Sequence, residues 1–407
     1  MKSTFLLIPL LLVAVLAVPA HAGSDAATIP GDANGDMQLT RTELTGAILG
    51  YLQEGGSAGA SMNLDDVRDA AHVYSCWNGT PLTVTDSAGR EIVMIRPLRR
   101  VVVFNGETLE TLRSLDFERE KIVGVDKYSK EKSAFFPEYQ DAENVGSVWS
   151  PDLEKVLSLK PDAVFLYATI STSACDEIQA KLQSSDPDIR IFRFDCFKPA
   201  SYMEEVETVG AITGREDEGA RFVAFYTGVM DRIGSEVAER PEGERVPVYF
   251  EYYTEYKTVA EGSGYDEKIN LAGGGNIFAD EPAEYPEIEP EAIIAANPSV
   301  VIKLVGKKLE FGGYCGGDAA PFAELQYQLL ARPGWGSLDA VKQQRVYLIH
   351  SDLLGGAQHF IGTAYLAAWF SPEGFADLDP GAIHRRYLLE FQHLEFDPLT
   401  DGIFVYP

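Results

Sequence analysis

The spacing of apolar and polar residues divides the chain into regions of different character. Within Leu82–Met94, two short alternating runs flank the turn residues 87–89, which predicts a β-hairpin. Beyond it, continuous apolar runs such as 101–104 and 163–167 alternate with segments of helical period. Strands buried on both faces and separated by helices are typical of a parallel sheet with helices on each side. We therefore expect an N-terminal α/β lobe over residues 81–200.

The same alternation returns in the second half of the chain, and a long helical segment separates the two halves. Residues 201–240 predict a helix, a break at Gly214 and a second helix. The second helix has about 25 residues and, at ~1.5 Å per residue, spans about 40 Å. A helix of this length can join two lobes. We therefore expect a C-terminal lobe over residues 241–407 and an α/β fold in which each lobe has a mainly parallel sheet with flanking helices.

Residues 1–22 have the build of a secretory signal peptide. Lys2 precedes an apolar run, Phe5–Val18, and the small residues Ala20 and Ala22 fit a cleavage site after Ala22. An uncleaved membrane anchor is the alternative. No other apolar stretch reaches the ~20 residues that cross a bilayer, so we expect an extracytoplasmic protein that is secreted or associated with the cell surface.

The stretch PGDANGDMQLTRTEL, residues 30–44, has the pattern of a calcium loop of the EF-hand type. Such a loop needs oxygen ligands at its first, third, fifth and twelfth positions and a backbone carbonyl at the seventh. Met37 stands at the sixth position, where a glycine normally permits the sharp turn. The alternative is an acidic turn that only caps a helix. The calcium interpretation predicts a structural ion bound by Asp32, Asn34, Asp36, Gln38 and Glu43.

Two helical patterns accompany this loop, ELTGAILGYL and NLDDVRDAAHVYSCW, and the second carries no ligand series. This arrangement resembles a dockerin with one working loop and one degenerate loop. It predicts a small all-α module over residues 23–80. A dockerin usually carries two working loops and docks to a cohesin, so the missing second loop counts against a cohesin partner. Because the module is a small part of the chain, we interpret calcium as an ion that stabilises the module and not as the basis of the main function.

The chain is strongly acidic, with a formal net charge of −28. This charge repels phosphate backbones and excludes nucleic acid as a partner. Hydrophobic residues still make up 45% of the chain, which is typical of packed domains rather than a disordered acidic chain. The excess of carboxylates is therefore expected on the surface.

The four cysteines, Cys76, Cys175, Cys196 and Cys315, match no zinc spacing. Export permits disulfides. Cys175 lies just past the carboxyl end of one predicted strand and Cys196 at the carboxyl end of the next, and neighbouring parallel strands would bring these ends together. We expect a disulfide between Cys175 and Cys196. The alternative is that all four cysteines are buried free thiols.

The sequence contains no HExxH pair, no Gly-x-Ser-x-Gly elbow and no GxxxxGK phosphate loop. His350 or His359 could act as a base, but nothing identifies a nucleophile. We therefore expect no enzyme activity, and a secreted hydrolase is kept as an alternative.

Three stretches together resemble one family: TVTDSAGREIVMIRPLRRVVVFN, NVGSVWSPDLEKVLSLKPDAVF, and GSGYDEKINLAGGGNIF with EIEPEAIIAANPSVVI. They are similar to the extracytoplasmic substrate-binding proteins of ABC importers for cobalamin and ferric siderophores, over residues 82–407. The resemblance implies two lobes joined by one long helix, with an iron complex (ferric siderophore or haem) or a corrinoid held between them. It implies delivery of this cargo to an ABC permease with its ATPase subunits. A calcium-dependent adhesion or scaffold protein of the cell surface is the alternative of another class.

The resemblance also implies a pair of surface glutamates, one on each lobe, that dock onto basic residues of the permease. The helix after Ser150-Pro151 and the helix EPEAII match the two sites, which points to Glu154 and Glu291. Two distant carboxylates fix orientation and speed the encounter. The alternative is that both are ordinary carboxylates in the first turn of a helix.

Ligands of a parallel sheet lie beyond the carboxyl ends of its strands. Aromatic residues at these ends suit a large flat or hydroxamate-like ligand, because rings give contact area at small entropic cost. Tyrosine and histidine could also ligate iron directly. The alternative to any ligand-binding role is that each ring packs in a core or on a rim. The ligand-binding residues that we expect, two of them from the resemblance, are Tyr128, Trp149, Tyr167, Tyr253, Tyr256 and His359.

Overall fold

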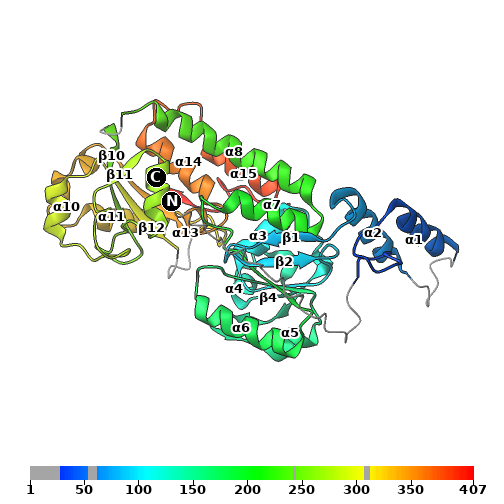
Figure 1. Cartoon of the computed structure of the whole chain (residues 1–407). Coiled ribbons are helices and arrows are strands. Elements are labelled where there is room, and N and C mark those ends of the chain that lie inside the picture. Colours follow the sequence, from blue (N-terminus) through cyan, green and yellow to red (C-terminus); the bar gives the residue numbers. More distant parts are fainter. Residues whose placement is uncertain (1–27, 54–61, 242–243, 307–311) are drawn as a thin grey trace, which may run out of the picture.

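The computed structural model describes residues 28–53, 62–241, 244–306 and 312–407. Figure 1 shows two α/β lobes side by side, a long helix running over both, and a two-helix module at one end. The predicted signal peptide lies outside the described residues. Within the described ranges, no helix has the length and apolar character of a membrane span. The predicted two-lobe α/β fold is confirmed.

The N-terminal lobe is a parallel sheet with helices on both faces, preceded by a hairpin. Its elements are β1 (Leu82–Thr85), β2 (Glu91–Met94), β3 (Val101–Val103), α3 (Gly106–Ser114), β4 (Ile122–Val125), α4 (Lys127–Glu131), β5 (Glu143–Asn144), β6 (Gly146–Ser147), β7 (Ser150–Pro151), α5 (Leu153–Ser158), β8 (Ala163–Leu166), α6 (Thr172–Ser185) and β9 (Arg190–Arg193). The sheet has the order β5-β4-β3-β8-β9, and all its strands are parallel. The predicted hairpin is confirmed as the antiparallel pair β1 and β2.

The C-terminal lobe repeats this plan, with one exception at its edge. Its elements are β10 (Val246–Glu251), α9 (Tyr265–Leu271), β11 (Gly274–Asn276), α10 (Pro290–Ala296), β12 (Val300–Val305), α11 (Ala320–Leu330), α12 (Asp339–Lys342), β13 (Val346–His350), α13 (Ser351–Leu354), α14 (His359–Phe370), α15 (Pro380–Glu390) and β14 (Val405–Tyr406). The sheet order is β11-β10-β12-β13-β14, and only β14 runs antiparallel. Strand β12 is buried along its whole length because helices cover both faces of the sheet.

Helix α7 (Tyr202–Thr213) and helix α8 (Glu216–Ala238) form the segment between the lobes. The break predicted at Gly214 is confirmed: this residue has φ 71° and ends α7, in a conformation that glycine adopts without a steric penalty. The 23 residues of α8 bury one apolar face, which packs on α3 and α7 at one end and on α9 and α14 at the other. The predicted helical connection between the lobes is therefore confirmed.

A second connection ties the lobes together behind the cleft. The Nε atom of Arg113 in α3 donates a hydrogen bond to the side-chain oxygen of Gln392, at 2.6 Å. Gln392 in turn donates to the Ser114 hydroxyl and to the Glu110 carbonyl, and the Tyr387 hydroxyl donates to the Glu110 carboxyl. All of these groups are buried. The segment after α15 thus completes the packing of α3 in the first lobe.

Apolar side chains on alternate strand positions separate into cores on the two faces of each sheet. Val101 and Val103 face a continuous core that runs through both lobes under α7, α8, α14 and α15. Val102 faces a separate core closed by α5 and α6, and the C-terminal lobe has its own outer core. Because each fully buried apolar side chain contributes about 1.5–3 kcal/mol, the shared core couples the stability of the two lobes.

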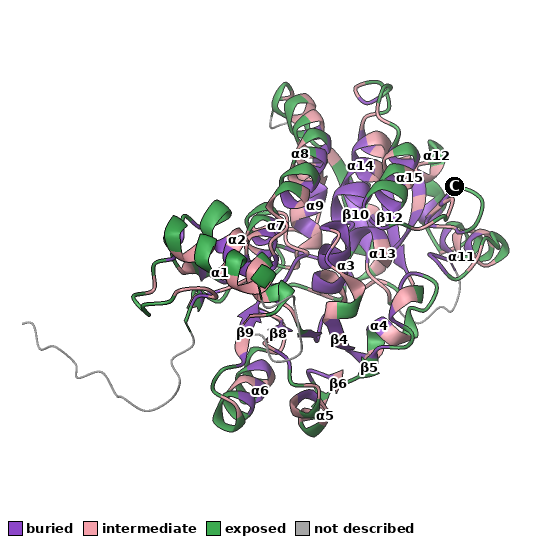
Figure 2. Ribbon diagram, turned by 90° about the vertical axis from the view of Figure 1, so that its right-hand side faces the viewer, coloured by how far each residue is buried: buried purple, intermediate pink, exposed green. Residues whose placement is uncertain are grey.

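The N-terminal module consists of α1 (Arg41–Gln53) and α2 (Leu64–Cys76). Helix α2 is attached to the first lobe by Arg99, whose guanidinium pairs with Asp66 at 3.1 Å and with Asp69. Helix α1 buries no residue. Figure 2 shows α1 as the exposed helix farthest from the lobes, on the outer side of α2. The module is therefore held through α2.

Candidate ligand-binding cleft

A cleft of about 450 Å³ lies between the lobes, at the carboxyl ends of both sheets. Glu107 at the start of α3, Tyr128 in α4 and Tyr167 after β8 line it from the first lobe. Tyr253 after β10 and Asp352 in α13 line it from the second. Its volume is typical of small-molecule sites, which have about 300–1,000 Å³. This is the position at which parallel sheets bind ligands.

A second hollow of about 800 Å³ adjoins this cleft between the lobes. Glu107 and Tyr265 line both spaces and separate them. Tyr252 and Tyr285 line the second space, and their rings lie 4.8 Å apart. The lobes therefore enclose more room than the central cleft alone.

Four of the six predicted ligand residues line the cleft. Tyr128 and Trp149 lie at its exposed rim, where their rings meet edge to face at 5.9 Å. Tyr167 and Tyr253 lie deeper and are partly buried. The Tyr167 hydroxyl donates a hydrogen bond to Glu107 Oε2 at 3.0 Å, and burial together with the Glu107 charge holds the pKa of Tyr167 well above its ordinary value. Tyr167 is therefore a protonated donor in this cleft.

Buried carboxyl groups form the floor of the cleft. Burial raises the pKa of Glu110 to about 7, against the opposing hydrogen bond from Tyr387. Burial also raises the pKa of Asp126 to about 6, although this side chain accepts hydrogen bonds from the amides of Tyr128 and Ser129 at 3.0 and 3.1 Å. Both groups gain protons far more readily than an exposed carboxylate does. A positive charge placed beside them would favour their ionised form.

One ion pair crosses the cleft. The Lys132 ammonium at the end of α4 lies 3.2 Å from a carboxylate oxygen of Asp352, and the other oxygen of Asp352 lies 3.2 Å from His350 Nδ1. Burial alone would raise the pKa of Asp352, but Lys132 and His350 outweigh it and hold this pKa well below its ordinary value. Lys132 is the only basic side chain among the described residues that line the cleft, against four carboxyl groups. The cleft is therefore acidic.

Tyr256 and His359, also predicted as ligand residues, lie outside the cleft. Tyr256 has φ 57°, and its ring packs under the Arg332 guanidinium, 4.6 Å from the ring centroid. His359 is fully buried: its Nδ1 donates to the Gly356 carbonyl at 3.1 Å and its Nε2 accepts from the Tyr226 hydroxyl at 2.8 Å. Burial lowers the pKa of His359 to about 3. Both side chains belong to the packing of the second lobe and of α8.

Sequence reasoning missed the charged residues of the cleft. Asp126 follows β4 directly and Glu107 follows β3 after three residues, so the strand-end rule that selected the tyrosines also applied to them. Asp352 lies two residues after β13. Lys132 carries no comparable signal, because its position depends on how α4 meets the other lobe.

The two predicted docking glutamates lie on different lobes. Glu154 is in the first turn of α5 and Glu291 in the first turn of α10, and both are exposed. Figure 1 shows these two helices well apart on the outside of the molecule. Among the described residues, no basic side chain pairs with either carboxylate. Their role in docking stays a prediction.

The predicted calcium loop is shaped by its own side chains. Asp32 accepts hydrogen bonds from the amides of Gly35 and Met37 at 2.8 and 2.9 Å, and Asn34 accepts from the Asp36 amide at 2.8 Å. Met37 adopts φ 63°, the conformation that a glycine normally takes at this position. The Glu43 carboxylate accepts hydrogen bonds from the amide and the hydroxyl of Thr40. Calcium binding by this loop stays a prediction.

The disulfide predicted between Cys175 and Cys196 is wrong, because both are free thiols. Cys175 lies in α6 and packs in the core on one face of the sheet. Cys196 lies in the core on the opposite face, where its sulfur accepts a hydrogen bond from Thr108 at 3.5 Å. Neighbouring strand ends do come together, but the two side chains lie on different sides of the sheet. The alternative of four buried thiols is wrong as well, since Cys76 and Cys315 are exposed.

Comparison with known proteins gives one family match and several relatives. Residues 101–353 match the family described as "Periplasmic binding protein". The ABC transporter substrate-binding lipoprotein YvrC of Bacillus subtilis is 23% identical over 305 residues, which cover 73% of this chain and 88% of YvrC. The molybdate-binding protein MolA of Haemophilus influenzae is 22% identical over 349 residues, which cover 77% of this chain and 92% of MolA.

A similar fold is found in the TroA-like periplasmic binding protein FepB of Veillonella parvula. Its crystal structure superposes with a TM-score of 0.70 and 23% sequence identity, over 80% of this chain and 99% of FepB. The part of the chain without a counterpart in FepB amounts to a fifth. The two lobes and the helix between them are therefore the common fold.

Proposed function

The chain belongs to the periplasmic binding protein family and is the substrate-binding component of an ABC transporter, and we propose that its cargo is an iron complex or a corrinoid. Members of this family bind a solute and deliver it to a permease; they are not enzymes. We propose that this chain works outside the cytoplasm and holds a ferric siderophore, haem or corrinoid between its lobes. The observation that carries the proposal is an acidic cleft with aromatic walls.

The charge of the cleft favours a cargo with positive charge over an oxyanion. Lys132, the basic side chain of the cleft, is already paired with Asp352. Glu107, Glu110 and Asp126 offer acceptors but no positive charge. An anion such as molybdate, which the relative MolA is named for, would meet repulsion from these carboxylates. A metal complex with a net positive charge instead gains from them.

The aromatic residues suit the organic part of such a complex. Tyr128 and Trp149 present ring faces and edges at the rim, and Tyr253 presents another ring from the opposite lobe. Rings of this kind provide a large contact area at a small cost in side-chain entropy. Because both lobes contribute, a bound cargo favours the arrangement in which the lobes are close together. We propose that the permease recognises this form through Glu154 and Glu291.

A direct binding assay tests the cargo. The full chain is titrated with a cationic ferric hydroxamate, haem, hydroxocobalamin and molybdate, while the tryptophan fluorescence is recorded. We expect quenching at micromolar or lower concentration by at least one metal complex and none by molybdate. Tight binding of molybdate, with no binding of any of the complexes, would overturn the proposal.

A pair of matched variants locates the binding. Tyr128→Ala should weaken binding about tenfold, because a stacked ring contributes about 1–1.5 kcal/mol. Tyr327→Ala is the control, since Tyr327 is exposed in α11, outside the cleft. Equal affinities for the two variants would place the cargo elsewhere on the protein.

A calcium-dependent adhesion or scaffold protein is the second candidate function. It is favoured by exposed apolar side chains on α1, namely Ile48, Leu49 and Leu52. This candidate predicts that the purified chain binds to cells of its source organism in calcium and detaches when calcium is chelated. If the chain binds a cargo but does not attach to cells in this way, only the transport function is supported.

A further inference from the structure

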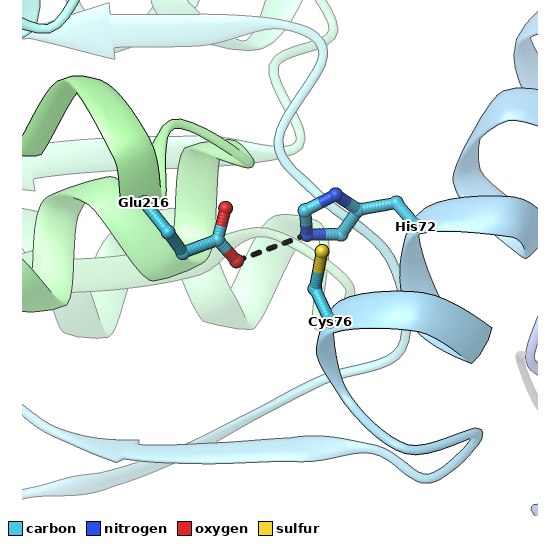
Figure 3. Close-up of side chains that lie close together, drawn as sticks. All are labelled: His72, Cys76 and Glu216. Carbon is cyan, nitrogen blue, oxygen red and sulfur yellow. Dashed lines mark hydrogen bonds and ion pairs between the residues drawn. The ribbon is translucent and has the colours of Figure 1, made fainter.

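The last turn of α2 and the first turn of α8 bring three metal-ligating side chains to one point. His72 and Cys76 are four residues apart on α2, so they lie on the same face of the helix. Glu216 opens α8. The ligand atoms of these three residues all lie within 4.8 Å of one another, and His72 Nε2 is 3.1 Å from Glu216 Oε1. Figure 3 shows the imidazole, the thiol and the carboxylate facing a common space.

We propose that His72, Cys76 and Glu216 bind a divalent transition-metal ion of the zinc type, which fastens the N-terminal module to the helix between the lobes. An imidazole, a thiolate and a carboxylate are the donors that zinc uses in proteins, whereas calcium and magnesium select oxygen donors alone. In a tetrahedral zinc site neighbouring donor atoms are about 3.3–3.8 Å apart. Small changes in the side-chain torsions of Cys76, which is exposed, and of Glu216, whose side chain is 38% exposed, would bring the separations into that range. A water molecule would complete the fourth position.

The histidine is held in place before any metal binds. Its ring packs against the backbone of Gly214, where an added Cβ would lie 3.3 Å from the ring carbon Cε1. Its ring also meets Trp77 edge to face at 5.4 Å. The side chain of His72 is only 18% exposed, but that of Glu216 is 38% exposed and Cys76 is exposed, so one side is open to solvent. The site is therefore preorganised and accessible to an ion.

The surrounding charges do not oppose a cation. Arg215 precedes Glu216, but its guanidinium is paired with Glu118 at 2.7 Å and with Glu218 at 3.5 Å. The amino end of α8 would by itself repel a cation, yet its first turn carries Glu216, Asp217 and Glu218. These three carboxylates outweigh the positive end of the helix.

This site is separate from the cleft and from the calcium loop. Its three ligands come from the N-terminal module and from α8, so a bound ion would strengthen a junction that already has the His72–Glu216 contact, beside the pairing of Arg99 with Asp66 and Asp69. An ion that binds only the folded arrangement stabilises it by linkage. Cargo binding does not require it.

Cobalt substitution tests the site in the full chain. The protein is stripped of metal, kept reduced with a phosphine, and titrated with Co²⁺ while its absorption spectrum is recorded. We expect one equivalent of Co²⁺ to give a thiolate-to-cobalt charge-transfer band and visible bands of a four-coordinate ion, which one equivalent of Zn²⁺ then removes. Oxygen ligands of the predicted calcium loop cannot give the thiolate band.

Matched variants assign the ligands. Cys76→Ser should abolish the charge-transfer band, and His72→Gln or Glu216→Gln should weaken Co²⁺ binding tenfold or more. Cys315→Ser controls for an exposed cysteine, and His393→Asn for a surface histidine paired with a carboxylate, Asp116; both should bind as the parent does. The proposal fails if the parent chain shows no thiolate band at saturating Co²⁺, or if Cys76→Ser keeps it.

A stability measurement covers the case in which a variant perturbs folding. Zn²⁺ should raise the melting temperature of the parent chain and leave that of Cys76→Ser unchanged. An equal rise in both proteins would also overturn the proposal. Neither result bears on the affinity for cargo, so the two proposals can fail independently.

Discussion

The carboxyl groups in the cleft and those on the outer faces of the lobes show what the environment does to one chemical group. In the cleft, Glu110 and Asp126 are buried and their pKa values rise to about 7 and about 6. On the outer faces, Glu154 and Glu291 stand exposed at the starts of helices. The buried groups gain a proton readily, whereas the exposed ones stand open to solvent and to any partner. The same chemical group is therefore suited to the proposed recognition of a cargo in one region and of a protein in the other.

Removing the outer carboxylates should have the largest effect, because it should affect transport and leave cargo binding unchanged. We expect the double variant Glu154→Ala, Glu291→Ala to abolish uptake of the cargo into cells and to leave the affinity of the purified chain unchanged. The physical reason is that neither charge lines the cleft, and both lie on outer helices where we propose that the permease docks. Uptake of radiolabelled or coloured cargo and the fluorescence titration measure the two quantities.

The double variant Glu177→Ala, Glu324→Ala is the control for this experiment, because both side chains are exposed on other helices. It should transport normally. A loss of affinity in the first double variant would show that the outer carboxylates and the cleft are not independent. A loss of uptake in the control would show that the effect is not specific to Glu154 and Glu291.

Replacing a buried carboxyl group by a neutral amide should change how the stability of the protein depends on pH. The folded-state pKa of Glu110, about 7, lies above the ordinary value of 4.5, so the unfolded chain loses this proton first as the pH rises. The ionisation of Glu110 therefore does not lower the free energy of unfolding below pH 4.5. It destabilises the fold progressively as the pH rises through 7. We expect Glu110→Gln to be more stable than the parent by about 3 kcal/mol at alkaline pH, with the difference vanishing in acid.

Urea unfolding of both proteins at several pH values measures this difference. Glu324→Gln serves as the exposed counterpart and should follow the parent at every pH. A pH-independent difference between Glu110→Gln and the parent would mean that packing, rather than ionisation, sets the effect.

The smallest effect is expected at the N-terminal loop, whose acidic side chains already bond to loop amides. Chelating calcium should lower the melting temperature of the N-terminal module by a few degrees and leave the cargo affinity unchanged. Differential scanning calorimetry with and without chelator, beside the fluorescence titration, distinguishes these quantities. A parallel fall in affinity would show that the loop and the cleft are coupled.

Local signals in the sequence were enough for the fold. The hairpin around residues 87–89, the break at Gly214 and the alternation of strands and helices each depend on residues close together in the chain. The strand-end rule likewise placed Tyr167 and Tyr253 on the cleft. These features follow from the hydrophobic periodicity of the sequence and from its turn-forming residues alone.

Features that depend on distant contacts could not be predicted in this way. His359 is buried because α14 packs on α8, where Tyr226 lies beside its ring. Cys175 and Cys196 differ in the face of the sheet that they occupy, which no spacing reveals. The meeting of His72 with Glu216, separated by 144 positions, likewise exists only after α2 has docked.

The hydrogen bond between Arg113 and Gln392 has a consequence for how the protein reaches its native state. The two residues are 279 positions apart, so Gln392 is synthesised long after α3. Until then the guanidinium has partners within the first lobe, the Phe135 carbonyl at 2.7 Å and the Glu138 carboxylate at 2.9 Å, but the hydrogen bond of its Nε atom is still unmade. Contacts between residues so far apart in sequence slow folding, so we expect the two lobes to consolidate together and late in the folding of the chain.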